Sequence, residues 1–321
     1  MNDIKVLNHA ADNIRILAAA SVEKGVVAPT PEEKAAYLKA WDAYTQTKGH
    51  DVVKFVPASG AASRMFKDVF AFVDAEYNTP ETDFEKTFFA RIKDAAFYAE
   101  LDATCQKLHN AGINALMANG KYKEVAAAML SKDGMNYGAL PKGLLKFHNY
   151  AEGARTPLEE HLVEGALYAR QEDGTVNVHF TVSPEHRALF EALVKEKAEV
   201  YAKQFNATFN VSFSEQKSST DTVAANSDNT PFRNADGSLL FRPGGHGALI
   251  ENLNEIDADV VFIKNIDNVV PDRLKEDTVE NKKLLAGILV ELQQQAFAYL
   301  EKLDSGCYNT NDLMEMLQFL Q

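Results

Sequence analysis

Short apolar runs alternate with longer stretches of helical periodicity along the middle of the chain. Apolar positions in FEKTFFARIKDAAFYAEL, residues 84–101, recur with the spacing of an amphipathic helix. Other stretches have the short apolar or alternating character of strands: 51–56 (DVVKFV), 176–182 (VNVHFTV), 208–216 (TFNVSFSEQ) and 257–267 (DADVVFIKNID). Strands that alternate with helices predict an α/β fold with a mostly parallel, twisted sheet and helices on both faces.

Threonine and proline mark the start of two predicted helices. Thr30, Pro31 and Glu33 form the pattern of a capping box with proline at the first helical position. A second Thr-Pro pair precedes the helix that begins near Pro157. Helices are also predicted over residues 1–48, 66–130, 183–205, 247–255 and 279–321. Trp41 is expected in the core of the N-terminal helical layer.

These elements suggest three segments. Residues 1–50 are predicted to be an N-terminal helical segment, and residues 51–275 an α/β domain with a helical insertion at about 68–135. Residues 276–321 are predicted to be C-terminal helices, with the apolar stripe of packed helices in ENKKLLAGILVELQQQAFAYLEKL and DLMEMLQFL.

Composition narrows the class of protein. The chain has 321 residues, 46% of them hydrophobic, which is typical of a globular protein. Its net charge of −13 argues against a nucleic-acid duplex as partner, although a single nucleotide needs only a few local cations. Two cysteines far apart, without a CxxC pair, indicate a reducing compartment. No secretory signal pattern or long apolar span is seen, so we expect a cytoplasmic protein without a membrane segment.

The stretch KFVPASGAASRMF, residues 54–66, carries the first candidate chemistry. A predicted strand ends there in a run of small residues, namely Ala58, Ser59, Gly60, Ala61, Ala62 and Ser63. Such a loop lets backbone N–H groups approach a phosphate, and Arg64 follows it with a fixed fork of donors. The Walker, Rossmann and hydrolase-elbow patterns are all absent. A tight turn packed with small residues explains the same sequence equally well.

Three later stretches add candidate ligand groups. Lys142 lies between a proline and a glycine in LPKGLLKF. RPGGHGALIENL surrounds His246 with three glycines, Gly244, Gly245 and Gly247. Asp267 and Asn268 end the most apolar predicted strand, which we expect to be buried on both faces. An aspartate at the carboxyl end of such a strand is a natural Mg²⁺ ligand, although Asp-Asn after a strand also often starts a turn or caps a helix.

Taken in order, these stretches resemble the sugar-nucleotide pyrophosphorylases of the UDP-sugar type. The series A-S-G-A-A-S-R-M, L-P-K, F-S-E-Q, P-G-G-H-G-A-L and I-D-N parallels the order in that family of G-G-x-G-T-R, P-K, a glutamine after a strand, P-x-G-N/H-G and V-D-N. The likeness covers about residues 51–270. The chain also resembles an uncharacterised bacterial family, a domain of unknown function related to those enzymes.

The resemblance implies a Mg²⁺-dependent nucleotidyltransferase with a nucleotidyltransferase-type, Rossmann-like sheet. Such an enzyme joins a nucleoside triphosphate, here expected to be UTP, to a sugar 1-phosphate and releases pyrophosphate. It implies that the small-residue loop wraps the triphosphate and base edge, that Arg64 holds the leaving phosphates, and that Lys142 neutralises the α-phosphate. It also implies that Gln216 faces the base, that the glycines around His246 lie against the base or ribose, and that Asp267 binds Mg²⁺.

The sequence also departs from that family. Ala62 and Ser63 replace a glycine and a threonine, His246 replaces the commoner asparagine, and 78 positions separate Arg64 from Lys142. Helices follow Asp267 where the family has its sugar-binding half. A nucleotide- or nucleotide-sugar-binding protein without turnover therefore remains an alternative. So does a different phosphate-ligand enzyme, or a structural domain with a fortuitous loop.

Overall fold

A four-stranded parallel sheet forms the centre of the described chain. The computed structural model describes residues 18–60, 62–242, 244 and 246–320. Its central sheet contains β1 (Val52–Pro57), β4 (Thr175–Val182), β5 (Thr208–Glu215) and β8 (Val260–Ile263). They lie in the order β5-β4-β1-β8, and every pair is parallel. The predicted α/β class with a mostly parallel sheet is therefore confirmed.

The pairing register brings the carboxyl ends of the strands to one edge. Pro57 of β1 lies beside Thr181 of β4, and Phe55 lies beside Ile263 of β8. β8 is an edge strand of the described sheet, and Ile263 is 49% exposed. The prediction that this strand is buried on both faces was therefore wrong, because an apolar sequence does not show whether a further strand or helix covers its outer face.

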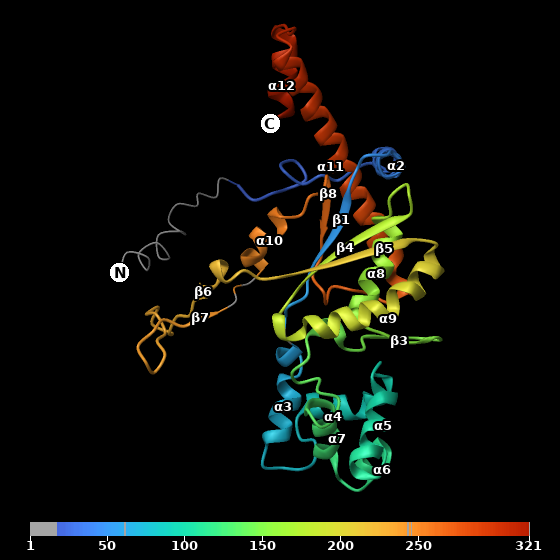
Figure 1. The fold of residues 1–321 in the computed structure, drawn as a ribbon, viewed down its shortest axis with the longest axis vertical. Coiled ribbons are helices and arrows are strands. Elements are labelled where there is room, and N and C mark those ends of the chain that lie inside the picture. Colours follow the sequence, from blue (N-terminus) through green and yellow to red (C-terminus); the bar gives the residue numbers. More distant parts are fainter. Residues whose placement is uncertain (1–17, 61, 243, 245, 321) are drawn as a thin grey trace. The chain divides into compact units, whose positions relative to one another are not determined.

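The helices agree with the predicted pattern over most of the described chain (Figure 1). They are α2 (Pro31–Thr45), α3 (Lys67–Asp74), α4 (Asp83–Arg91), α5 (Tyr98–His109), α6 (Ile113–Ala118), α7 (Tyr122–Leu130), α8 (Pro157–Tyr168), α9 (Arg187–Phe205), α10 (Ile250–Asn254), α11 (Lys275–Asp304) and α12 (Thr310–Phe319). Glu33 N–H donates to Thr30 Oγ1 and Thr30 N–H to Glu33 Oε2, so the capping box before α2 forms as predicted. Residues 18–30 contain no helix, and residues 1–17 of the predicted first helix lie outside the described residues.

One face of the sheet is covered by α8 and α9. Leu158 and Leu162 of α8 and Phe190 of α9 pack with the inward side chains of β4, including Val178 and Phe180, in one buried cluster. α8 is buried nearly all round, and a Thr156 capping box with Glu159 fixes its first turn. The helix therefore runs through the interior instead of along the surface.

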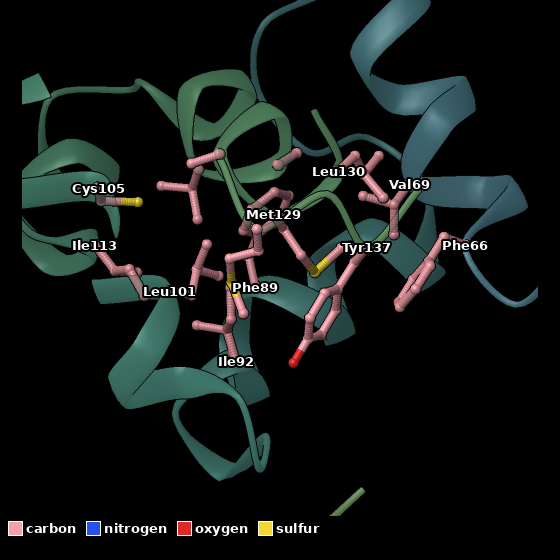
Figure 2. Close-up of a cluster of buried hydrophobic side chains, with 14 of the residues drawn as sticks. Phe66, Val69, Phe89, Ile92, Leu101, Cys105, Ile113, Met129, Leu130 and Tyr137 are labelled. Atoms are coloured by element: carbon pink, nitrogen blue, oxygen red, sulfur yellow. The ribbon is translucent and has the colours of Figure 1, made fainter. Parts of the chain in front are cut away.

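Helices α3 to α7 form a second core of their own between β1 and the segment that contains Lys142 (Figures 1 and 2). Figure 2 shows Phe66, Val69, Phe89, Leu130 and Tyr137 directed into this core. Aromatic edge-to-face contacts recur in it, with the Phe89 and Tyr122 rings 5.0 Å apart. These helices occupy the region where the sequence predicted a helical insertion.

The chain divides into two compact units. The sheet unit consists of Thr45–Gln216 and Leu249–Val279, and contains the central sheet, α3 to α10 and the small hairpin β2 (His148–Tyr150) and β3 (Gly153–Arg155). The other, called here the peripheral unit, consists of Met1–Tyr44, Lys217–Ala248 and Glu280–Gln321. It contains the antiparallel pair β6 (Thr222–Val223) and β7 (Phe241–Arg242).

Trp41 and both cysteines lie in the described part of the chain. Trp41 is 1% exposed and its ring stacks on Tyr44, so its core position is confirmed. Cys105 is buried, Cys307 is exposed, and both are free thiols. None of the helices that the structure describes is long and apolar enough to cross a membrane.

Candidate functional site

The strand order of the sheet places a switch point between β1 and β8. From β1 the chain adds β4 and then β5 on one side, and later adds β8 on the other side. In open parallel sheets, ligands bind outside the carboxyl ends of the strands at the point where the order reverses. The loop after β1 and the loop after β8 flank that point, and they contain the small-residue run and Asp267, respectively.

Two of the six small residues are explained by packing. Ala58 and Ala62 are each 0% exposed, and they belong to the two different buried clusters of the sheet unit. Ala58 N–H donates to Thr181 O at 2.8 Å, which continues the sheet for one more residue. Ser59 and Gly60, by contrast, are exposed. The packed-turn alternative thus accounts for the alanines, and the solvent-facing Ser59 and Gly60 remain available to a ligand.

The segment around Lys142 lies directly beside this loop. Lys142 N–H donates to Gly60 O at 3.3 Å, and Ala62 N–H donates to Leu140 O at 3.3 Å. Helices α3 to α7 therefore leave the sheet after β1 and return the chain to the same place. Lys142 thus lies beside Gly60, although 82 positions separate the two residues in the sequence.

Lys142 and Asp267 form an ion pair at the switch point. Lys142 Nζ lies 2.5 Å from Asp267 Oδ2, with side chains 25% and 39% exposed. Ile266 N–H donates to Pro57 O at 3.1 Å, which places Asp267 immediately beyond the end of β1. A Cβ on Gly143 would lie 3.1 Å from Ile266 and 2.8 Å from Phe190, so a glycine is needed for Lys142 to approach this closely.

Arg64 and Gln216 follow two strands of the same sheet, β1 and β5. Arg64 is exposed on the 3₁₀ turn that follows the loop, and four residues of chain place its Cα at most about 14 Å from that of Gly60. Gln216 is half-buried directly after β5. That strand is two positions from β1, or about 10 Å across the sheet. Ala61 and the side chain of Ser63 lie outside the part of the chain that the structure describes.

The glycine-rich stretch belongs to the peripheral unit. Gly244 is half-buried and Gly247 is exposed, and His246 opens a 3₁₀ turn. Gly245 lies outside the described residues. The roles that the resemblance implies for these four residues stay predictions.

A buried ionic cluster lies beneath the site, and the sequence analysis missed it. Glu164 of α8 is fully buried and accepts hydrogen bonds from Lys54 of β1 at 3.0 Å and Lys264 after β8 at 2.7 Å. Burial acts to raise the pKa of Glu164, but the nearby cations outweigh it and lower the pKa to about 2. Burial lowers the pKa of Lys54 to about 7, despite the attraction of Glu164. Through Glu164, the cluster links β1 and the end of β8 to the same helix, α8.

His161 connects α8 to the loop that contains Asp267. Its Nε2 lies 3.1 Å from both Asn265 O and Ile266 O, and the side chain is fully buried. Burial lowers the pKa of His161 well below its ordinary value, so the ring is neutral and Nε2–H is the donor to these carbonyls. His161 thereby holds the two residues that precede Asp267.

A second polar cluster lies where α8 begins. Glu160, which is 0% exposed, accepts from Tyr150 OH at 2.7 Å and pairs with Lys275 Nζ at 2.6 Å. Arg155 pairs with Asp272 at 2.8 Å and its guanidinium lies 3.8 Å from the centre of the Tyr150 ring. Charges of both signs are matched here, and the cluster joins the β2–β3 hairpin to the loop after β8.

A signal for both clusters is present in the sequence. PLEEHLVEGALY places Glu159, Glu160, His161 and Glu164 within two turns of a helix whose other residues are apolar. Charged residues are almost never fully buried unless they are paired, so a helix that is apolar around them indicates buried ion pairs. The partners Lys54, Lys264 and Lys275 cannot be assigned without the fold.

The donor groups at the switch point limit which metal could bind there. Among the described residues, no three His, Cys, Asp or Glu side chains gather as a protein metal site requires. Asp267 supplies one carboxylate, and the Lys142 ammonium 2.5 Å away competes with a free cation. Mg²⁺ takes one or two carboxylates together with phosphate oxygens and water. Asp267 therefore fits a Mg²⁺ that arrives with a triphosphate, and not Mg²⁺ alone.

The fold and the site together define an α/β protein with polar side chains at the switch point of a parallel sheet. A family model described as a domain of unknown function, DUF4301, matches residues 1–321, so the chain belongs to that family. No curated protein and no solved structure matches the chain. The expected membership of an uncharacterised family is thus confirmed, and no relationship to the UDP-sugar pyrophosphorylases is established.

Proposed function

We propose that the chain is a nucleotidyltransferase that transfers a nucleotidyl group from a nucleoside triphosphate, with UTP as the expected donor, to a sugar 1-phosphate. The observation that supports this proposal most is the ion pair between Lys142 and Asp267 beside Gly60, at the switch point between β1 and β8. A cation, a carboxylate and exposed loop backbone are the groups that bind a triphosphate with its metal.

In the proposed reaction, a phosphate oxygen of the sugar phosphate attacks the α-phosphorus of the triphosphate. The bond from that phosphorus to the bridging oxygen breaks, and pyrophosphate leaves with the electron pair. The protein supplies charge neutralisation and positioning and needs no nucleophile of its own. Lys142 would meet the α-phosphate, and Arg64 would hold the β- and γ-phosphates.

The ion pair explains how the site remains neutral before a ligand arrives. In the free protein Lys142 and Asp267 satisfy each other. A phosphate that takes over Lys142 leaves the Asp267 carboxylate to the Mg²⁺ carried by the triphosphate, which supplies Lewis-acid stabilisation when bound. His161 and the Glu164 cluster hold the backbone on which Asp267 lies.

The test is pyrophosphate release from UTP with a panel of sugar 1-phosphates, by the wild type and by Lys142→Ala. Loss of one transition-state charge contact should lower turnover by about 10²- to 10³-fold and weaken nucleotide binding less. Lys146→Ala is a matched control, because Lys146 is similarly exposed at 27% and has other partners, Ala154 O at 3.1 Å and Glu159 at 3.8 Å. Full turnover in Lys142→Ala would contradict the proposed contact between Lys142 and the α-phosphate.

Nucleotide binding without turnover is the alternative that the same assay distinguishes. In that case UTP or a UDP-sugar binds and Lys142→Ala weakens its binding, but no sugar 1-phosphate releases pyrophosphate. Absence of both binding and turnover would contradict the proposed function itself.

A further inference from the structure

The C-terminal helices carry an apolar face that does not belong to the site described above. α12 runs back along α11 as a hairpin within the peripheral unit (Figure 1). The Tyr299 and Phe319 rings lie 5.4 Å apart, and Lys302 bonds to Asp312 at the turn end. The two helices are therefore antiparallel.

Five leucines of α11 lie exposed on one side. Leu285, Leu289, Leu292, Leu300 and Leu303 are 60%, 49%, 51%, 55% and 38% exposed. At about 100° per residue, they fall within a sector about 80° wide. Between residues 284 and 300 the only charged residue is Glu291, and it lies outside the leucine sector on the helical wheel. The leucine side of α11 therefore lacks the charged residues that are usual on a solvent-exposed helix face. The sequence predicted a packed stripe here, and most of its leucines lie exposed.

Two described helices of the peripheral unit, α2 and α12, contact other sides of α11. α2 packs against the side of α11 that carries Gly287, where an added Cβ would lie 2.0 Å from Tyr37 O. α12 lies on the side of Tyr299 and Lys302. On the helical wheel, Gly287 lies about 180° from the centre of the leucine sector, whereas Tyr299 and Lys302 lie about 60° and about 120° from it, so α12 flanks the sector on one side.

α12 carries an apolar sector of its own. Leu313, Met314, Leu317 and Leu320 are 38%, 61%, 53% and 78% exposed. On the wheel the centre of this sector lies about 150° from the side that carries Phe319 and Asp312. Because α11 and α12 run in opposite directions, the two exposed sectors point to the same side of the hairpin. The hairpin thus presents a continuous apolar face made from both helices.

We propose that this hairpin face is a homodimer interface, in which two copies pack face to face as a four-helix bundle. Two antiparallel helices with a shared apolar face are half of such a bundle, and a face that packs on its own copy is complementary by symmetry. In α11, the residues at 285, 289, 292, 296, 300 and 303 are three or four positions apart, which is the spacing of helix packing seams.

The area of the face suits a second copy. The nine exposed side chains, at roughly 80 Å² apiece, amount to about 700 Å² per copy. Stable interfaces of standard size bury about 800 Å² per partner, and homodimer interfaces are the more apolar class. The assignment does not depend on the proposed function.

The test is the mass of the full chain in solution, measured by light scattering during size exclusion over a range of concentrations. The wild type should have twice the 35.5 kDa of one chain. Leu289→Glu and Leu317→Glu should each weaken dimerisation by about 30-fold or more, with an unchanged circular dichroism spectrum. Leu189→Glu on α9 is the matched control, since Leu189 is 47% exposed and belongs to the sheet unit.

Two results would overturn the proposal. A wild type with the mass of one chain at every concentration would exclude the dimer. A dimer that persists in Leu289→Glu and Leu317→Glu would place the interface elsewhere. If these variants unfold more easily while the wild type is monomeric, the face is covered by another part of the same chain.

Discussion

Lys142 Nζ and Asp267 Oδ2 lie 2.5 Å apart, although 125 positions separate the two residues in the sequence. One follows the helical layer of α3 to α7, and the other follows the last strand of the sheet. Both side chains are partly exposed, so their attraction is screened by water. Such a pair contributes little to folding, and this distinguishes it from the buried ion pairs beneath it.

The first prediction concerns the stability contribution of this pair. Lys142→Met and Asp267→Asn should each change the free energy of unfolding by at most about 1 kcal/mol, since an exposed pair rarely contributes more. Urea unfolding of the ligand-free variants measures this change. A loss of several kcal/mol in either variant would show that the pair is structural, and would argue against a role in ligand binding.

The second prediction concerns the loop backbone. A Cβ on Gly60 would meet no atom within 4 Å, and its φ lies outside the left-handed region, so Gly60→Ala should leave the melting temperature unchanged. If the loop contacts a phosphate, the added methyl group should weaken nucleotide binding by about tenfold, or about 1.4 kcal/mol. Calorimetric titration with UTP and Mg²⁺ checks this, and equal affinity in both proteins would exclude close contact at Gly60.

The sequence predicted the four strands and most helices of the described chain, because β-branched runs and capping residues are local signals. The sequence also identified Lys142 and Asp267 as candidate site residues. Both lie beside residues that are typical of turns, namely Pro141 and Gly143 for Lys142 and Asn268 for Asp267. The ion pairs of Glu164 could not be predicted from the sequence. Its partners Lys54 and Lys264 lie on β1 and directly after β8, far from Glu164 in the sequence, and only the fold brings them together. The sequence also did not predict that Ile263 and the α11 leucines are exposed. Apolar periodicity shows which residues share a face, but it does not show whether another element packs on that face.

The third prediction concerns Glu164. Glu164→Gln should lower the free energy of unfolding by about 3–5 kcal/mol, because it leaves two buried ammonium groups without a counter-charge. Glu196→Gln is a control with the same chemical change, since Glu196 is exposed and pairs with Lys197 only at the surface. It should cost about 0.5 kcal/mol or less. Similar losses in the two variants would contradict the buried-cluster description.

The fourth prediction is a pH dependence that arises from Lys54. Its pKa in the folded protein is about 7, whereas the unfolded chain keeps this proton up to about pH 10.4. Between these values the unfolded state binds more protons, so this group makes the free energy of unfolding increase with pH.

The difference in unfolding free energy between the wild type and Lys54→Met should therefore increase from about pH 7 to about pH 9.5, with a slope of at most about 1.4 kcal/mol per pH unit. Urea unfolding of both proteins across this range provides the measurement. A difference that stays constant, or that falls as the pH increases, would show that Lys54 remains charged in the folded protein.

The proposed nucleotide site at the switch point is tested most directly by the melting temperature with UTP or a UDP-sugar. A ligand at about 100 times its Kd adds roughly 2.7 kcal/mol to stability. The melting temperature should increase with nucleotide and Mg²⁺ together, increase less with EDTA or in Asp267→Asn, and stay unchanged with Mg²⁺ alone. Lys146→Ala should behave as the wild type. An equal increase with and without metal would remove Asp267 as a metal ligand, and no increase with any nucleotide would contradict the nucleotide site altogether.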